Sequence, residues 1–116
     1  MLLEAIACET PVVSVDCPAG PKEILKKMSS LNNIDIPVKE VEYSDYGVLI
    51  PPFNLNADFD ESLELTDGEI LFANSVIKLL KNEELYNKYK NICRERIKDF
   101  STEVINSQWI NLIDSL

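Results

Sequence analysis

The sequence predicts an α/β fold in which a few parallel strands are flanked by helices. Two observations carry this prediction. Residues 12–15 form a short β-branched run without charge, which is typical of a strand buried on both faces. Good helix formers precede this run at residues 2–7, and a Gly20-Pro21 step that can open a second helix follows it. Because the first helix has no strand before it, we expect the chain to be a fragment that begins inside a larger domain.

The middle of the chain predicts a connector and a second buried strand. Pro11 ends the first helix, and residues 26–45 form a connector. Within it, residues 34–36 can form a short edge strand. Residues 48–50, Val-Leu-Ile, form the second buried strand, which ends at Pro51. We therefore expect two or three parallel strands with helices on both faces.

The second half of the chain predicts three helices with clear start signals. Residues 53–66 form an acidic loop, and Thr66 with Glu69 fits a capping box. Asn82 caps the next helix, which has two glutamates in its first turn. Ser101 caps the last helix. Apolar residues recur at helical spacing behind each cap, as expected of helices that pack on one side.

Composition limits the classes of function. The chain has 116 residues, 46% of them apolar, which suits one compact core at the small end of domain sizes. Its net charge of −9, from 11 basic and 20 acidic residues, argues against nucleic acid as a partner. No apolar run reaches the roughly 18 residues that would suggest a membrane span. We expect a cytoplasmic protein.

The cysteines predict neither a metal site nor disulfides. Cys8, Cys17 and Cys93 show no C-x-x-C spacing, and the chain contains no histidine. An odd count argues against a disulfide framework, so we interpret them as small buried thiols in a reducing compartment. Asp58 and Asp60 spell a D-x-D motif, but they lie in the acidic loop and are interpreted as a solvated charge run.

Three stretches occur in an order that resembles a known family. They are residues 2–25 (LLEAIACETPVVSVDCPAGPKEIL), residues 46–51 (YGVLIP), and Phe100-Ser101 followed by Glu103, Gln108 and Trp109. Together they resemble the nucleotide-sugar-binding C-terminal domain of glycosyltransferase family 4, the retaining enzymes of the GT-B fold. The resemblance implies that residues 1–116 are part of this Rossmann-like domain and that the N-terminal acceptor domain is absent. A complete domain of this type has about six strands.

The resemblance also implies a substrate and a set of binding residues. The donor would be a UDP- or GDP-sugar, and its sugar would pass to an acceptor hydroxyl in glycan or polysaccharide biosynthesis. Glu4 would accept hydrogen bonds from the donor's ribose hydroxyls, and the backbone amides near Leu2 and Leu3 would face the diphosphate. Gly20 would lie beside the donor pocket. The glutamate that contacts the transferred sugar would precede Met1, so this chain offers no catalytic residue.

Further features of the family bear on partners and on details of the fold. Enzymes of this type need no metal or other cofactor, and any peripheral membrane contact would come through the missing N-terminal domain. Glu9 stands where the family usually has glycine, which costs backbone energy at a helix end. Arg94 and Arg96 are explained by i,i+4 pairing or exposure on their helix. Trp109 is expected to pack the final helix, partly exposed here because that helix reaches toward the missing domain.

Two other functions stay open. The chain could be a noncatalytic module that binds a nucleotide or a partner chain, or it could derive from a nucleotide-sugar epimerase of the same fold. The ending with Phe100-Ser101, Gln108 and Trp109 favours the transferase. As a fragment, the chain is expected to have little or no activity alone.

Overall fold

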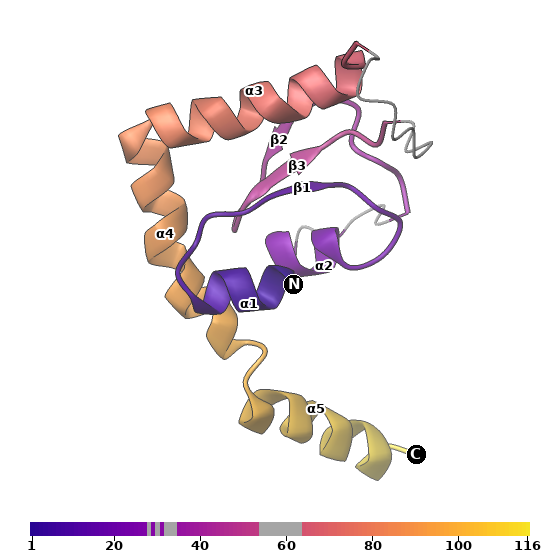
Figure 1. The fold of residues 1–116 in the computed structure, drawn as a ribbon. Coiled ribbons are helices and arrows are strands. Elements are labelled where there is room, and N and C mark those ends of the chain that lie inside the picture. Colours follow the sequence, from indigo (N-terminus) through magenta and orange to yellow (C-terminus); the bar gives the residue numbers. More distant parts are fainter. Residues whose placement is uncertain (28, 30, 32–34, 54–63) are drawn as a thin grey trace.

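The chain folds into a three-stranded sheet with five helices among the residues that the structure describes (Figure 1). This structure is a computed structural model, and it describes residues 1–27, 29, 31, 35–53 and 64–116. In chain order the elements are α1 (Leu2–Ala7), β1 (Val13–Val15), α2 (Pro21–Leu25), β2 (Glu42–Tyr43), β3 (Val48–Ile50), α3 (Asp67–Lys81), α4 (Glu83–Lys98) and α5 (Thr102–Asp114).

The sheet is mixed, which corrects the expectation of parallel strands alone. Its order is β1-β3-β2. The β1 and β3 strands pair in parallel, with Val13 opposite Val48, whereas β2 and β3 pair antiparallel, with Tyr43 opposite Val48. A short turn joins β2 to β3, and strands joined by so short a turn must run antiparallel. The Ser44 N–H donates to the Gly47 carbonyl across this turn at 2.9 Å.

Two strand predictions need correction. The central strand buried on both faces is β3, in which all three residues are fully buried, whereas β1 lies at an edge and is only partly buried. The short strand expected at residues 34–36 does not form in its described part, because Asp35 and Ile36 lie in a turn. Residue 34 lies outside the described residues. The additional strand, β2, lies further along the connector.

Helices cover both faces of the sheet, as predicted (Figure 1). On the face with α1 and α2, Ile6 and Leu25 pack against Leu49 of β3. On the face with α3, Leu79 packs against Val48 and Ile50. Helix α4 runs along the edge and contributes Cys93 to the first cluster and Tyr89 to the second. The alternation of side chains along β3 therefore divides the core into two layers.

The helix starts follow their predicted capping residues. Thr66 and Glu69 form both hydrogen bonds of the capping box at α3. The Asn82 side chain accepts from the Leu85 N–H, and the Ser101 side chain accepts from the Val104 N–H. Local side-chain chemistry is sufficient to fix these boundaries, because each cap satisfies backbone donors that the helix cannot satisfy itself.

The last helix, α5, lies away from the sheet, beyond the end of α4 (Figure 1). None of its residues is buried, and the Trp109 side chain is 61% exposed. Trp109 is therefore partly exposed, as expected, and is not packed into a core. The apolar side of α5 lacks a covering element among the described residues.

Candidate functional site

The residues predicted to bind a nucleotide sugar lie on α1 and at the start of α2. Leu2 is partly buried against the Ile6 cluster, and Leu3 is half-buried. The Glu4 side chain is 78% exposed, and its carboxylate lies 2.5 Å from the Met1 ammonium. This ammonium and a backbone hydrogen bond lower the pKa of Glu4 below its ordinary value of 4.5. Glu4 is therefore an exposed, ionised hydrogen-bond acceptor at neutral pH.

Gly20 lies at the N-cap of α2, directly before Pro21. Its φ of +102° is in the region that favours glycine. No atom lies within 4 Å of the position that a Cβ would take, so a side chain would strain the backbone without a steric clash. Helices α1 and α2 lie against each other (Figure 1), which brings Leu2, Leu3 and Glu4 to the same side of the sheet as Gly20. Among the described residues, no hydrogen bond or ion pair joins Glu4 to Gly20.

A buried ion pair that the sequence did not predict lies at the carboxyl end of β1. Asp16 follows this strand directly, and its carboxylate lies 2.9 Å from the Lys22 ammonium in the first turn of α2. Both side chains are buried, at 2% and 9% exposure. The Val38 N–H donates to the same Asp16 oxygen at 2.8 Å, and Lys22 donates to the Ile36 carbonyl. The signal available in the sequence was a charged residue immediately after a β-branched run.

A cavity of about 210 Å³ opens beside this pair, at the carboxyl ends of β1 and β3. Cys17, Pro18 and Pro37 line it together with the ion pair. In open α/β sheets, ligands bind outside the carboxyl ends of parallel strands, so this edge of the sheet is the expected place for a ligand. The cavity does not include Glu4, Leu2, Leu3 or Gly20 in its lining.

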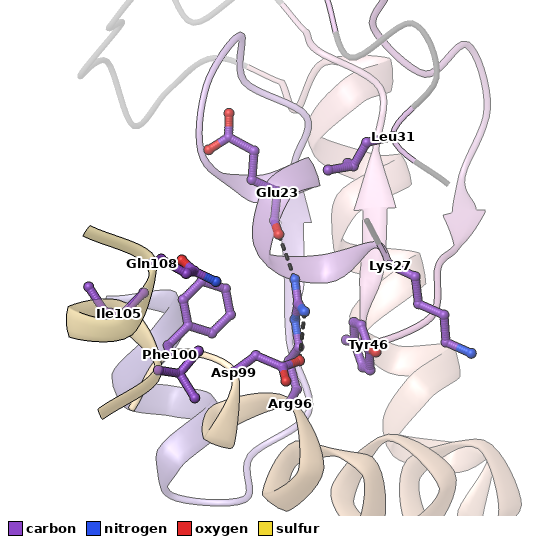
Figure 2. Close-up of a pocket in the computed structure, with 10 residues that line it drawn as sticks. Glu23, Lys27, Leu31, Tyr46, Arg96, Asp99, Phe100, Ile105 and Gln108 are labelled. Atoms are coloured by element: carbon purple, nitrogen blue, oxygen red, sulfur yellow. Dashed lines mark hydrogen bonds and ion pairs between the residues drawn. The ribbon is translucent and has the colours of Figure 1, made fainter. Parts of the chain in front are cut away.

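A larger cavity of about 540 Å³ lies between α2, the end of α4 and α5 (Figure 2). Arg96 is one of the residues that line it. The guanidinium donates to the carbonyls of Glu23, Ile24 and Lys26, at 2.6, 2.7 and 3.2 Å, and pairs with Asp99 at 2.9 Å. The rings of Tyr46 and Phe100 lie 4.5 and 4.8 Å from it. Arg96 thus fastens α4 to the end of α2.

Arg96 and two of the three cysteines differ from their predicted environments. Arg96 is buried and held by distant backbone carbonyls, so neither i,i+4 pairing nor exposure explains it. Arg94 is exposed, as expected, and pairs with Glu9 of a distant segment. Cys93 is buried as expected, but Cys8 and Cys17 are exposed. Burial raises the pKa of the Cys93 thiol. The contacts of Arg94 and Arg96 join residues far apart in the sequence, which helical spacing cannot reveal.

The acidic D-x-D motif at residues 58–60 lies outside the described residues. Within the described part of the chain, no group of three or more histidine, cysteine or acidic side chains is arranged to hold a metal ion. The search for long apolar helices, over the same part of the chain, finds none that could cross a membrane.

Comparison with known proteins gives a match to a glycosyltransferase. It is 35% identical to an uncharacterized glycosyltransferase of the archaeon Methanocaldococcus jannaschii over 116 aligned positions, which cover 97% of this chain. The chain is related to a glycosyltransferase. It spans 27% of the length of that relative. No family model matches the chain. No solved structure matches it.

Proposed function

We propose that this chain is part of the nucleotide-sugar-binding domain of a retaining glycosyltransferase of family 4, with the GT-B fold. The observation that carries the proposal is the relation to a glycosyltransferase over 97% of the chain. The donor is a UDP- or GDP-sugar, and the sugar passes to a hydroxyl of a glycan acceptor. The arrangement of α1, β1 and α2 supports this proposal, because parallel strands with helices on both faces suit nucleotide binding.

In this proposal α1 supplies the contacts to the donor. The Glu4 carboxylate accepts hydrogen bonds from two ribose hydroxyls, a task that its two oxygens suit. The amides of Leu2 and Leu3, at the start of α1, face the diphosphate, and Gly20 approaches the donor from the start of α2. The exposure and ionisation of Glu4 support its role as an acceptor.

The chemistry assigned to this chain is binding and orientation. Sugar transfer with these residues depends on holding the donor in a reactive geometry and on stabilising charge on the departing diphosphate. The described residues supply a carboxylate acceptor and backbone donors for those tasks. The acceptor-binding part and the glutamate that contacts the transferred sugar belong to the remainder of such an enzyme.

The first test measures nucleotide binding with and without the Glu4 carboxylate. Dissociation constants for UDP and GDP are measured by titration calorimetry for the chain and for Glu4→Gln. Loss of hydrogen bonds to a charged acceptor costs about 1.5–3 kcal/mol, so we expect roughly 10- to 100-fold weaker binding.

The matched control is Glu84→Gln, which removes an exposed glutamate from the first turn of α4. It alters net charge and helix-end electrostatics in the same way but should leave nucleotide affinity unchanged. Equal affinities in the chain and in Glu4→Gln would contradict the role of Glu4. If the unaltered chain binds neither nucleotide, the proposed function itself fails for this part of the protein.

A further inference from the structure

The loop between β1 and α2, residues 17–20, is closed at its base by the Asp16–Lys22 ion pair. Asp16 is the last residue before the loop, and Lys22 is the second residue of α2. Their charged atoms lie 2.9 Å apart, and both side chains are nearly inaccessible to solvent. An ion pair at this place fixes the distance between the two ends of the loop.

The same pair fixes a second segment beside the loop. Asp16 accepts the Val38 N–H at 2.8 Å, and Lys22 donates to the Ile36 carbonyl. Residues 36–38 are therefore attached to the carboxyl end of β1 through side chains, without a strand pairing of their own. The end of the strand, the start of the helix and the connector meet at one buried charge pair.

The loop itself is stiff and exposed. Pro18 and Pro21 restrict φ at two positions, and Gly20 takes a φ of +102° between them. Cys17, Pro18 and Ala19 are exposed at the carboxyl edge of the sheet, where ligands of α/β folds bind. A small change at the base of this loop would therefore displace the backbone that a ligand meets.

We propose that Asp16 and Lys22 are positioning residues that hold the loop of residues 17–20 in the shape that binds the nucleotide part of the donor. The inference rests on the proposed function, in which Gly20 lies beside the donor. It goes further by assigning to Asp16 and Lys22 a role in binding that acts through the shape of the loop. Their effect on affinity follows from the precision that a preorganised site requires.

Stability alone does not explain why two charged side chains are buried at this position. A buried ion pair can often be replaced by uncharged side chains of similar size with little loss of stability, whereas removal of one partner leaves a buried charge without compensation. The double variant Asp16→Asn with Lys22→Met removes both charges and keeps the side-chain volumes close to the original. It therefore separates the position of the loop from the stability of the fold.

The test compares UDP and GDP affinity at a temperature where each variant is fully folded, as established by thermal melting. We expect the double variant to fold and to bind about tenfold or more weakly, because a displaced loop loses its alignment with the ligand. Lys22→Arg keeps the charge pair and should retain most of the affinity. Lys26→Met breaks the nearby Lys26–Glu42 pair, which does not touch the loop, and should match the unaltered chain.

A second variant keeps the test decisive if the double variant fails to fold. Gly20→Ala leaves the ion pair intact and meets no atom within 4 Å, but it strains the loop at its positive φ. We expect affinity to fall while the fold remains. Wild-type affinity in a folded double variant or in Gly20→Ala would overturn the inference. Absence of nucleotide binding by the unaltered chain would instead overturn the proposed function on which it rests.

Discussion

Tyr89 shows how much one buried side chain contributes to joining the elements. Its hydroxyl donates to the Ser44 carbonyl at 2.9 Å, and its ring is fully buried between α4 and the β2–β3 hairpin. Burial raises the pKa of Tyr89 from 10.0 to about 12, and the nearby Tyr43, Asp45 and Glu42 add to this effect. The neutral phenol is therefore strongly preferred in the folded chain.

This pKa predicts a loss of stability at high pH. Below pH 10 the phenol is protonated in both states, whereas between pH 10 and about 12 the unfolded chain loses its proton first. The free energy of unfolding should then fall by about 1.4 kcal/mol per pH unit on account of Tyr89. Urea unfolding near pH 9 and near pH 11 should show the fall, reduced in Tyr89→Phe.

Tyr89→Phe also carries its own cost below pH 10. It leaves the Ser44 carbonyl without this donor, which should lower stability by about 1 kcal/mol. Tyr86→Phe is the control, because Tyr86 lies on the same helix and is only partly buried. If Tyr89→Phe and the unaltered chain lose stability equally between the two pH values, another group causes the loss.

At the scale of residues, the sequence predicted local conformation better than distant contacts. Glu9 takes a φ of +57°, as expected where the resembling family has glycine. Its ion pair with Arg94, and the hydrogen bonds of Arg96 to three carbonyls, join segments that are 70 or more residues apart in the chain. Helical spacing places a side chain on a face but does not say what that face meets.

At the scale of elements, start signals of helices were reliable because each acts within one turn. Thr66, Asn82 and Ser101 all cap the helices that they were expected to cap. The β2 strand was missed because it consists of only two residues. Its formation depends on β3 as a partner, which propensity within the connector cannot indicate.

Helix α5 should depend on its cap more than the other helices do. It buries no residue, so little tertiary packing offsets the loss of the bond between Ser101 and the Val104 N–H. Ser101→Ala should cost about 1 kcal/mol of local helix stability. Far-UV circular dichroism should show lower helix content, while the melting temperature of the remaining fold stays nearly unchanged.

A control variant and a second measurement accompany this prediction. Ser107→Ala changes a serine within the same helix and should not reduce helix content, because alanine is the better helix former. Trp109 is the single tryptophan and lies on α5, so its emission reports on this helix alone. If Ser101→Ala also lowers the melting temperature of the remaining fold, α5 is coupled to the core after all.

At the scale of the whole molecule, the two-layer core was predictable from the sequence, but the order of the strands in its sheet was not. Two apolar strand runs between helices indicated a sheet covered on both faces. Which strand lies in the centre depends on pairing, and the pairing places β3 between β1 and β2. The candidate site shows the same division. Glu4 and Gly20 are proposed from the sequence motif, whereas the Asp16–Lys22 pair became visible only in three dimensions.

The net charge of −9 predicts a response of the entire fold to salt. Repulsion among the surplus acidic residues destabilises the compact state, and ions screen it when they shorten the Debye length from about 30 to 3 Å. The buried Asp16–Lys22 pair is screened less than surface charges, and exposed pairs such as Arg94–Glu9 contribute little. The melting temperature should therefore rise between about 0.01 and 1 M sodium chloride.

The variant Glu95→Lys, at an exposed position of α4, changes the net charge by two, from −9 to −7. At low salt, Glu95→Lys should have a higher melting temperature than the unaltered chain, and its melting temperature should rise less when salt is added. A melting temperature that falls with salt would show instead that attractive ion pairs outweigh the net repulsion in this molecule.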